Sequence, residues 1–174
     1  MTPTYAYGVV ILPPPDLYRK VLSLRKQHPL LDSMTPPHIT VKSPFYFRYT
    51  GAAVVEKLEE ICEQFVPFEI EIRGIDTFRQ RVVYARVEDT PELYDLHHAL
   101  VDGLTGYVET LTDRWDGDGF RPHLTLADKL APQDIGPVKR LLSDFRPFSR
   151  FVVDKVHLLR GRGRWDIFRT FSLG

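Results

Sequence analysis

Only one cysteine, Cys62, occurs among the 174 residues, so the chain cannot form an internal disulfide. Disulfides are typical of secreted proteins, whereas thiols in the cytoplasm stay reduced. The scarcity of cysteine therefore favours a cytoplasmic protein. Cys62 itself lies in a glutamate-rich helical stretch, EKLEEICEQF, where we expect it to be a buried apolar residue.

The chain also lacks a long apolar run and a net charge. The N-terminal stretch MTPTYAYGVVILPPPD has no basic segment before its short apolar run, so it predicts a first strand and not a signal peptide. The 23 Lys and Arg residues balance 23 Asp and Glu residues. A protein that follows a long phosphate backbone is usually more basic. We therefore expect a small or terminal substrate, no membrane partner and no obligatory protein partner.

Charge is unevenly spread in spite of this balance. Residues 56–95 lean acidic, and the segment from residue 139 onwards leans basic. Two solvated faces of opposite sign would explain this pattern. The alternative is a local anion-binding site that is formed partly by the C-terminal segment.

Prolines and glycines separate segments with strand periodicity from segments with helix periodicity. We expect strands at residues 5–12, 38–42, 68–78, 82–87, 123–126, 148–159 and 167–173, and helices at residues 16–27, 52–65, 91–108 and 135–145. Each half then runs strand, helix, strand, helix, strand. This order predicts an α+β fold made by internal duplication, with two antiparallel-rich sheets or sheet halves related by an approximate twofold axis. We expect one domain, 1–174, with lobes at about 1–80 and 81–174 between which the chain can cross.

Two short segments repeat one chemical pattern: PHITV at 37–41 and PHLTL at 122–126. Chance gives about 0.4 copies of a His-x-Thr triplet at this composition, yet both copies here follow a proline and have aliphatic residues at the open positions. Because side chains alternate along a strand, His38 and Thr40 point to one face and the aliphatic residues to the other. The same holds for His123 and Thr125. Two halves packed around a twofold axis would bring both pairs to one cleft.

Two imidazoles and two hydroxyls in one volume suit the chemistry of phosphate esters. Histidine titrates near neutral pH, so one ring can accept a proton while the other donates one. Threonine hydroxyls can donate hydrogen bonds to non-bridging phosphate oxygens. Because imidazolium and hydroxyl groups can balance the developing charge, this chemistry needs neither a metal ion nor another cofactor.

The doubled motif resembles that of the 2H phosphoesterase superfamily, which is named for two H-x-[T/S]-x tetrapeptides and includes 2′-5′ RNA ligase/cyclic phosphodiesterase proteins. The resemblance implies a bilobal fold in which outer helices surround a central cleft lined by both motifs. It also implies metal-independent hydrolysis of a 2′,3′-cyclic phosphate or a related phosphodiester at a nucleotide or RNA terminus. By this resemblance His38 protonates the departing ribose oxygen and His123 activates water. Thr40 and Thr125 then hold the phosphoryl oxygens.

One position departs from the pattern of the ligase-like members. These often carry arginine soon after the second motif, as in PHLTLAR, whereas PHLTLADK places Asp128 there. An acid repels phosphate, so the chain looks more like the shorter, divergent bacterial 2H proteins. The missing cation and further substrate contacts are expected among Lys42, Arg121, Lys129, Arg162, Arg164, Trp165 and Tyr7.

Several of these features have alternative interpretations. The stretch GRGRW (161–165) also predicts a hairpin turn between the last two strands, and Tyr7 suits the core as well as the cleft. The loop TDRWDGDGF (112–120) lacks the other ligands of a calcium site, so we expect a turn-rich loop near the cleft. The two motif histidines could bind zinc, but no Cys or His cluster at the spacing of zinc ligands accompanies them. The alternative functions are a non-catalytic module that binds a nucleotide or RNA end in the same cleft, and an RNA 2′-5′ ligase.

Overall fold

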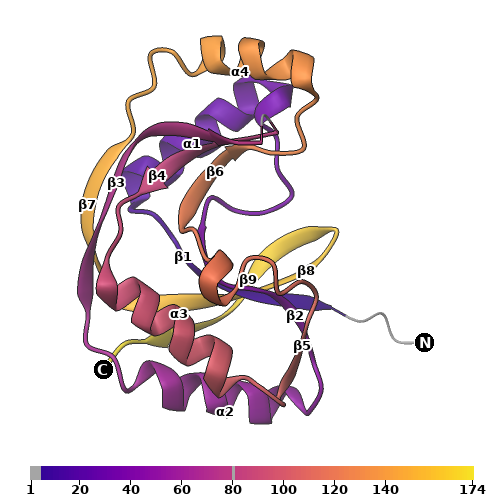
Figure 1. The fold of residues 1–174 in the computed structure, drawn as a ribbon, viewed down its shortest axis with the longest axis vertical. Helices are drawn as coiled ribbons and strands as arrows, with labels where there is room; N and C mark the ends of the chain where they lie inside the picture. The colour runs from indigo at the N-terminus through magenta and orange to yellow at the C-terminus, as the bar shows by residue number, and fades with distance from the viewer. Residues whose placement is uncertain (1–4, 80) are drawn as a thin grey trace.

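The computed structural model describes residues 5–79 and 81–174 (Figure 1). The helices in these ranges are α1 (Pro15–Gln27), α2 (Gly51–Cys62), α3 (Pro91–Gly103) and α4 (Ile135–Leu141), with 3₁₀ helices η1 (Pro29–Leu31), η2 (Gly117–Gly119) and η3 (Pro132–Asp134). The strands are β1 (Ala6–Ile11), β2 (Ile39–Phe47), β3 (Phe68–Phe78), β4 (Val82–Val87), β5 (Val108–Thr110), β6 (His123–Ala127), β7 (Phe148–Val153), β8 (Lys155–Arg162) and β9 (Arg164–Ser172). No helix of the described residues is long and apolar enough to cross a membrane.

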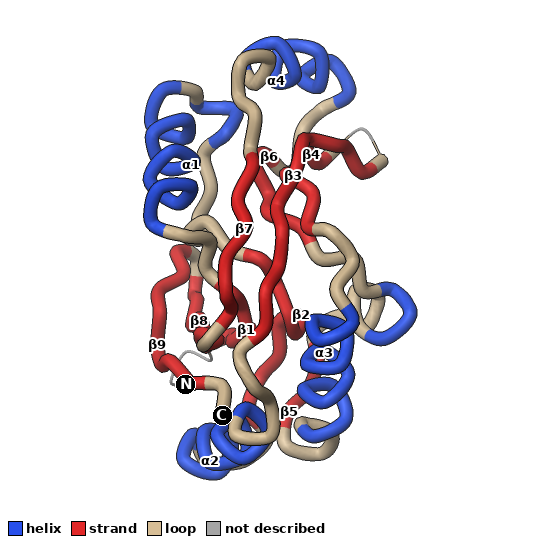
Figure 2. Tube along the Cα trace, turned by 90° about the vertical axis from the view of Figure 1, so that its left-hand side faces the viewer, coloured by secondary structure: helices blue, strands red, loops and turns tan. Residues whose placement is uncertain are grey.

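The strands pair antiparallel in the order β7-β3-β4-β6-β2-β1-β8-β9, with β5 beside β2. Strands β7, β3, β4 and β6 lie with α1 and α4 at one end of the molecule, and the other strands lie with α2 and α3 at the opposite end (Figure 1). Figure 2 shows the same division after a 90° turn. The expected α+β class, with antiparallel strands and outer helices, is confirmed.

The two halves of the sheet are joined by one residue pair, in which Ile39 of β2 lies opposite Leu124 of β6. The two sheets or sheet halves expected from the sequence are thus halves of one sheet. Each half takes strands from both 1–80 and 81–174, so the chain crosses between the halves. The motif strands β2 and β6 are the ones that meet at this junction, which explains how segments 85 residues apart reach one site.

Several elements differ from the expected bounds. The strand expected at 38–42 runs on to Phe47 as β2, and the helices expected at 52–65 and 135–145 end at Cys62 and Leu141. The helix expected at 91–108 ends at Gly103, and Gly106, with a φ of 85°, turns the chain into the short strand β5. The strand expected at 148–159 is interrupted at Asp154, because β7 pairs with β3 in one half and β8 pairs with β1 in the other. The break falls at two adjacent exposed polar residues, Asp154 and Lys155, which the single expected strand had passed over.

The aliphatic residues of the two motifs anchor the junction in the core. Ile39, Val41 and Leu124 are fully buried, and Leu126 is almost fully buried. The intervening histidines and threonines keep partial exposure. Burial on one face thus fixes which face of each strand presents the polar residues, because a one-residue slip would exchange the two faces.

Shortening Ile39 to alanine should destabilise the protein more than the same change at an exposed isoleucine. Deleting a fully buried aliphatic side chain usually costs about 2–5 kcal/mol of unfolding free energy. The matched control is Ile167→Ala on β9, where the side chain is 46% exposed, and a change of about 1 kcal/mol or less is expected there. Urea denaturation followed by circular dichroism would measure both values. Equal losses in the two variants would contradict the anchoring role of Ile39.

Candidate active site

The junction of β2 and β6 brings the two motifs together on one face of the sheet. Extending its antiparallel register by one residue in each direction places His38 beside Thr125 and Thr40 beside His123. Neighbouring residues on paired strands share a face, so all four side chains lie on the same side of the junction. The arrangement has a local twofold character, with one histidine and one threonine contributed by each strand.

Each motif histidine binds the carbonyl oxygen two residues before it. His38 Nδ1 lies 2.7 Å from the Pro36 oxygen, and His123 Nδ1 lies 2.7 Å from the Arg121 oxygen. A carbonyl can only accept, so Nδ1 carries the proton in both rings. In the neutral imidazole, Nε2 is then left with its lone pair. Both rings are therefore held in the tautomer that can accept a proton at Nε2 and, once protonated, donate it.

The proline before each histidine explains this shared geometry. Pro37 and Pro122 stand between the histidine and the carbonyl that it binds. A residue before proline is restricted to extended backbone, and the proline ring fixes its own φ. Proline also has no backbone N–H to compete for the ring nitrogen. The prolines that the sequence pairs with both motifs thus restrict the turn in which each ring is hydrogen-bonded.

Burial keeps both rings uncharged near neutral pH. Desolvation lowers the pKa of His38 to about 4, against the opposing hydrogen bond to Pro36, and the nearby charges of Arg25 and His123 lower it further. Desolvation also lowers the pKa of His123, against its hydrogen bond to Arg121. A group that binds phosphate here would bring the negative charge that favours protonation of a ring.

Arg25 on α1 is a site residue that the sequence analysis missed. It is 8% exposed, and its guanidinium donates to the carbonyl oxygens of Thr35 at 2.6 Å and Thr125 at 3.4 Å. It therefore ties the segment before the first motif to the strand of the second. Burial lowers the pKa of Arg25 and the carboxylate of Asp128 raises it. The sequence gives no sign of this role for Arg25, because basic residues are common in the last turn of a helix.

A cavity of about 570 Å³ opens beside the junction and is lined by Thr40, His123 and Thr125. His38 does not line it, but lies close enough to His123 for a positive charge on His123 to lower the pKa of His38. The walls carry both charge and apolar surface. The described residues that supply them are the cations Arg79, Arg81, Arg114, Arg121 and Lys129, the acid Asp128, and the aromatic residues Phe78, Trp115 and Phe120.

Two of the expected substrate contacts, Arg121 and Lys129, are therefore at the cavity, and Lys42 is not. The Lys42 side chain is 2% exposed and its ammonium lies 2.6 Å from the Asp116 carboxylate. It also donates to Thr110 Oγ1 at 3.0 Å. The expectation that Lys42 supplies the missing cation is thus corrected: its charge is already neutralised inside the protein.

The remaining expected contacts also lie outside this cavity. Arg162 and Arg164 are exposed neighbours of Gly163, whose φ of 93° makes the hairpin turn between β8 and β9. Arg164 and Trp165 line a separate cavity of about 300 Å³. Tyr7 stacks on Phe47 at 3.8 Å between ring centres. The hairpin alternative for GRGRW is confirmed, and none of these four residues lines the cavity that contains His123.

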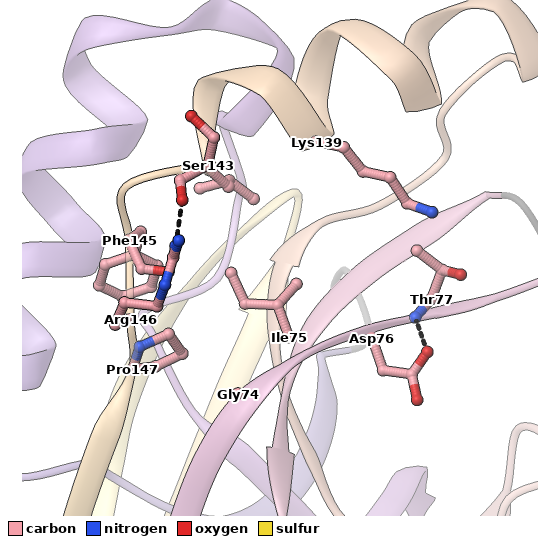
Figure 3. Close-up of a pocket in the computed structure, with 10 residues that line it drawn as sticks. Gly74, Ile75, Asp76, Thr77, Lys139, Ser143, Phe145, Arg146 and Pro147 are labelled. Atoms are coloured by element: carbon pink, nitrogen blue, oxygen red, sulfur yellow. Dashed lines mark hydrogen bonds between the residues drawn. The ribbon is translucent and has the colours of Figure 1, made fainter.

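A further cavity, of about 370 Å³, lies between β3 and the segment that follows α4 (Figure 3). It holds neither motif, and its Arg146 guanidinium is hydrogen-bonded to the carbonyl of Ser143. Within residues 5–79 and 81–174, no three His, Cys, Asp or Glu side chains gather closely enough to hold a metal ion.

Comparison with known proteins decides the family. A model of the 2′-5′ RNA ligase superfamily matches residues 13–165. The chain belongs to this superfamily. Its likeness to the 2H phosphoesterases, first indicated by the two motifs, is thereby confirmed.

Relatives in the 2′-5′ RNA ligase superfamily match the chain along almost its whole length. A protein of Bacillus licheniformis is 30% identical over 173 residues, which cover 97% of this chain and 98% of that protein. A protein of Bacillus pumilus is 32% identical over 174 residues, covering 97% of each. Both bear the name "Putative phosphoesterase". At a coarse level these names agree with phosphoesterase chemistry.

Solved structures with low sequence identity share the fold. Escherichia coli LigT complexed with 3′-AMP is 15% identical, with a TM-score of 0.62 over 98% of this chain and 99% of that one. The protein TT0787 of Thermus thermophilus is 18% identical, with a TM-score of 0.61 over 97% of each chain. The curled antiparallel sheet with its helices is thus an arrangement shared with these proteins.

Stability should fall in acid because the folded protein keeps His38 neutral. The pKa of histidine is about 6.5 in an unfolded chain, and that of His38 is about 4 in the fold. Between these values the unfolded state binds more protons than the folded state. The unfolding free energy is therefore greatest above about pH 6.5 and falls as the pH is lowered towards 4. His38 alone contributes a slope of up to about 1.4 kcal/mol per pH unit.

Urea denaturation between about pH 4 and pH 8, the range in which histidine titrates, would measure this slope. The variant His38→Asn removes the titrating ring and should show a shallower dependence. The control Thr40→Val changes a neighbouring motif residue and keeps every histidine, so it should retain the steeper dependence. An identical slope in His38→Asn and the unchanged protein would contradict the low pKa.

Proposed function

We propose that the protein is a metal-independent phosphodiesterase that hydrolyses 2′,3′-cyclic phosphates at nucleotide or RNA ends. The observation that carries the proposal is the matched pair of imidazoles, each fixed through Nδ1 to the carbonyl two residues before it. Two rings with free Nε2 atoms on one face of the sheet can supply the acid and the base of phosphoryl transfer. A binding site alone would not need two rings held in the same tautomer.

The surroundings of the cavity support a substrate that carries phosphate and an aromatic base. Its volume of about 570 Å³ falls in the usual range for small-molecule sites. Its basic side chains would attract phosphate, although the chain as a whole is neutral. LigT, which shares the fold, has been crystallised with 3′-AMP, ATP and NADP⁺. We extend the binding of nucleotides to the present chain as part of the proposal.

The charges around the rings favour His38 as the base and His123 as the acid. The Arg25 cation lies near His38 and disfavours a second positive charge there, and burial has lowered the pKa of His38 to about 4. His123 lines the cavity, where an anionic phosphate would favour its protonation. The family resemblance implies the reverse roles. We give precedence to the charges that surround each ring in this chain.

In the proposed reaction, His38 accepts a proton at Nε2 from the attacking water. The new oxygen–phosphorus bond forms as the bond to one ribose oxygen breaks, and His123 gives its Nε2 proton to that oxygen. Thr40 and Thr125 donate hydrogen bonds to the non-bridging oxygens, while Arg121 and Lys129 add positive charge at the cavity. The product is a phosphate monoester, and the proton count balances because one ring gains the proton that the other loses.

Loss of either motif histidine should remove activity on a 2′,3′-cyclic nucleotide measured with EDTA present. We expect a loss of about 10²- to 10⁴-fold for His38→Ala and for His123→Ala. The control His28→Ala, at the end of α1, should keep the activity of the unchanged protein. Tight nucleotide binding without turnover would instead support a non-catalytic module. Turnover that EDTA abolishes would contradict the metal-independent mechanism.

The acid and the base can be told apart with a leaving group that needs no proton. In thymidine 3′-(p-nitrophenyl phosphate), p-nitrophenolate leaves without protonation, so the variant that lacks the acid should lose less activity there than on the cyclic nucleotide. We expect this smaller loss for His123→Ala and similar losses on both substrates for His38→Ala. The opposite pattern would exchange the two roles and leave the proposed reaction intact.

A further inference from the structure

One wall of the cavity is the loop between β5 and β6, residues 111–121, which we call the cleft loop. It contributes Arg114, Trp115, Phe120 and Arg121 to the lining. Trp115 is 43% exposed. Three of the four catalytic candidates, Thr40, His123 and Thr125, line the same cavity. A large flat side chain that stays partly exposed beside them is suited to contact a ligand, because aromatic residues otherwise bury most of their surface.

The cleft loop is fixed to β2 by a buried ion pair. Asp116 Oδ2 accepts a hydrogen bond from the Lys42 ammonium at 2.6 Å, and Asp116 Oδ1 accepts one from the Ser43 N–H at 3.1 Å. The Ser43 hydroxyl donates to the Thr112 carbonyl at 3.0 Å. The Lys42 and Asp116 side chains are 2% and 8% exposed. These contacts attach the loop to the strand that also carries Thr40 and follows His38.

His97 on α3 fixes the same loop from a second side. It is fully buried; its Nδ1 lies 2.6 Å from the Val41 oxygen, and its Nε2 accepts the Gly117 N–H at 2.8 Å. Its ring stacks on Phe120 at 3.9 Å with an interplanar angle of 2°. Both hydrogen bonds require a neutral ring protonated at Nδ1. We call Lys42, Asp116 and His97 the loop anchor.

The loop is also closed tightly on itself. A Cβ atom at Gly119 would lie 2.1 Å from the Arg114 carbonyl oxygen, so only glycine fits at this position. Gly117 has a φ of 59°, which glycine adopts without strain. The backbone on either side of Trp115 is thus held by internal packing and by the loop anchor, and the indole is presented from a preorganised loop.

A buried ion pair is a poor way to gain stability, because desolvation offsets much of its attraction. Here the charged groups, the neutral imidazole and the glycines all act on the cleft loop, which lines the cavity together with residues from other segments.

We propose that Trp115 stacks on the base of the nucleotide substrate and that the loop anchor holds it in position to do so. The inference rests on the proposed function and adds a specificity-determining residue and a set of positioning residues to it. A phosphate bound at His123, Thr40 and Thr125 would leave the nucleoside to extend along the same cavity, whose apolar surface includes Trp115 and Phe78. Every base offers a face for stacking, so this contact distinguishes nucleotides from other phosphate esters more than one base from another.

The chain offers a direct optical test, because it has two tryptophans. The variant Trp165→Phe leaves Trp115 as the single indole, and Trp165 does not line this cavity. Adding adenosine 2′-monophosphate should quench the remaining emission, whereas inorganic phosphate and ribose 5-phosphate should not. If calorimetry shows that the nucleotide binds and Trp115 emission stays constant, the stacking contact is overturned.

Kinetics separate stacking from the chemistry. On a 2′,3′-cyclic nucleotide, Trp115→Ala should raise KM by roughly 5- to 100-fold, the range expected for one base–aromatic stack, with little change in kcat. On methyl riboside 2′,3′-cyclic phosphate, which has no base, Trp115→Ala and the unchanged protein should have equal activity. If Trp115→Ala and the unchanged protein have equal KM values on the cyclic nucleotide, the inference is overturned and the proposed function is left intact. Absence of turnover and binding in the unchanged protein would overturn both.

The loop anchor is tested with Asp116→Asn in the Trp165→Phe background. We expect a red shift of Trp115 emission, weaker quenching by the nucleotide and the same rise in KM as in Trp115→Ala, with kcat on the base-free substrate retained. If this variant does not fold, the pair Lys42→Met and Asp116→Leu removes both charges together and takes its place. A folded anchor variant with unchanged emission and unchanged KM would overturn the positioning role.

Discussion

The site depends on one antiparallel contact, the pair of Ile39 and Leu124 that joins the two halves of the sheet. Both residues are fully buried, and each is flanked in sequence by a polar residue on either side. Hydrophobic burial of the pair therefore orients four polar side chains at once. The chemistry is built around a packing contact, and no separate structure is needed to bring the two motifs together.

The protein environment then decides what those side chains can do. Hydrogen bonds at Nδ1 make the two rings alike, whereas their surroundings make them different: His38 lies near the buried cation Arg25, and His123 faces the cavity. Two residues of the same type can in this way take opposite roles in proton transfer. Asp128, which by sequence opposes phosphate binding, lies at the cavity and near enough to Arg25 for its carboxylate to raise the pKa of that guanidinium.

The parts that depend on local pattern could be predicted from the sequence. Strand alternation identified His38, Thr40, His123 and Thr125, and the bounds of β3 and β4 agree with their periodicity. What depends on a distant partner could not be predicted in this way. By its place in the alternation of the strand, Lys42 is expected at the surface. Only the fold reveals Asp116 beside it, 74 residues further on.

The same limit applies to the sheet and to the remaining site residues. The residues on both sides of Asp154 favour strands, and which strand each part pairs with depends on segments far along the chain. Arg25 belongs to a helix whose pattern is that of an ordinary amphipathic surface helix, and its role arises from where the helix packs. Trp115 lies in a loop whose acidic residues resemble part of a calcium site, and its place at the cavity depends on contacts with distant segments.

Strand β2 and the residue before it supply both groups of the proposed reaction and groups that hold the cleft loop. His38 and Thr40 belong to the reaction, and Lys42 and Ser43 hold the loop that forms a wall of the cavity. Arg114 and Trp115 of the cleft loop are not among the groups of the proposed reaction, so a change at either can alter the range of accepted substrates while the reaction is retained. An insertion or deletion within β2 would alter both at once, and the strand is therefore the least evolvable part of the site.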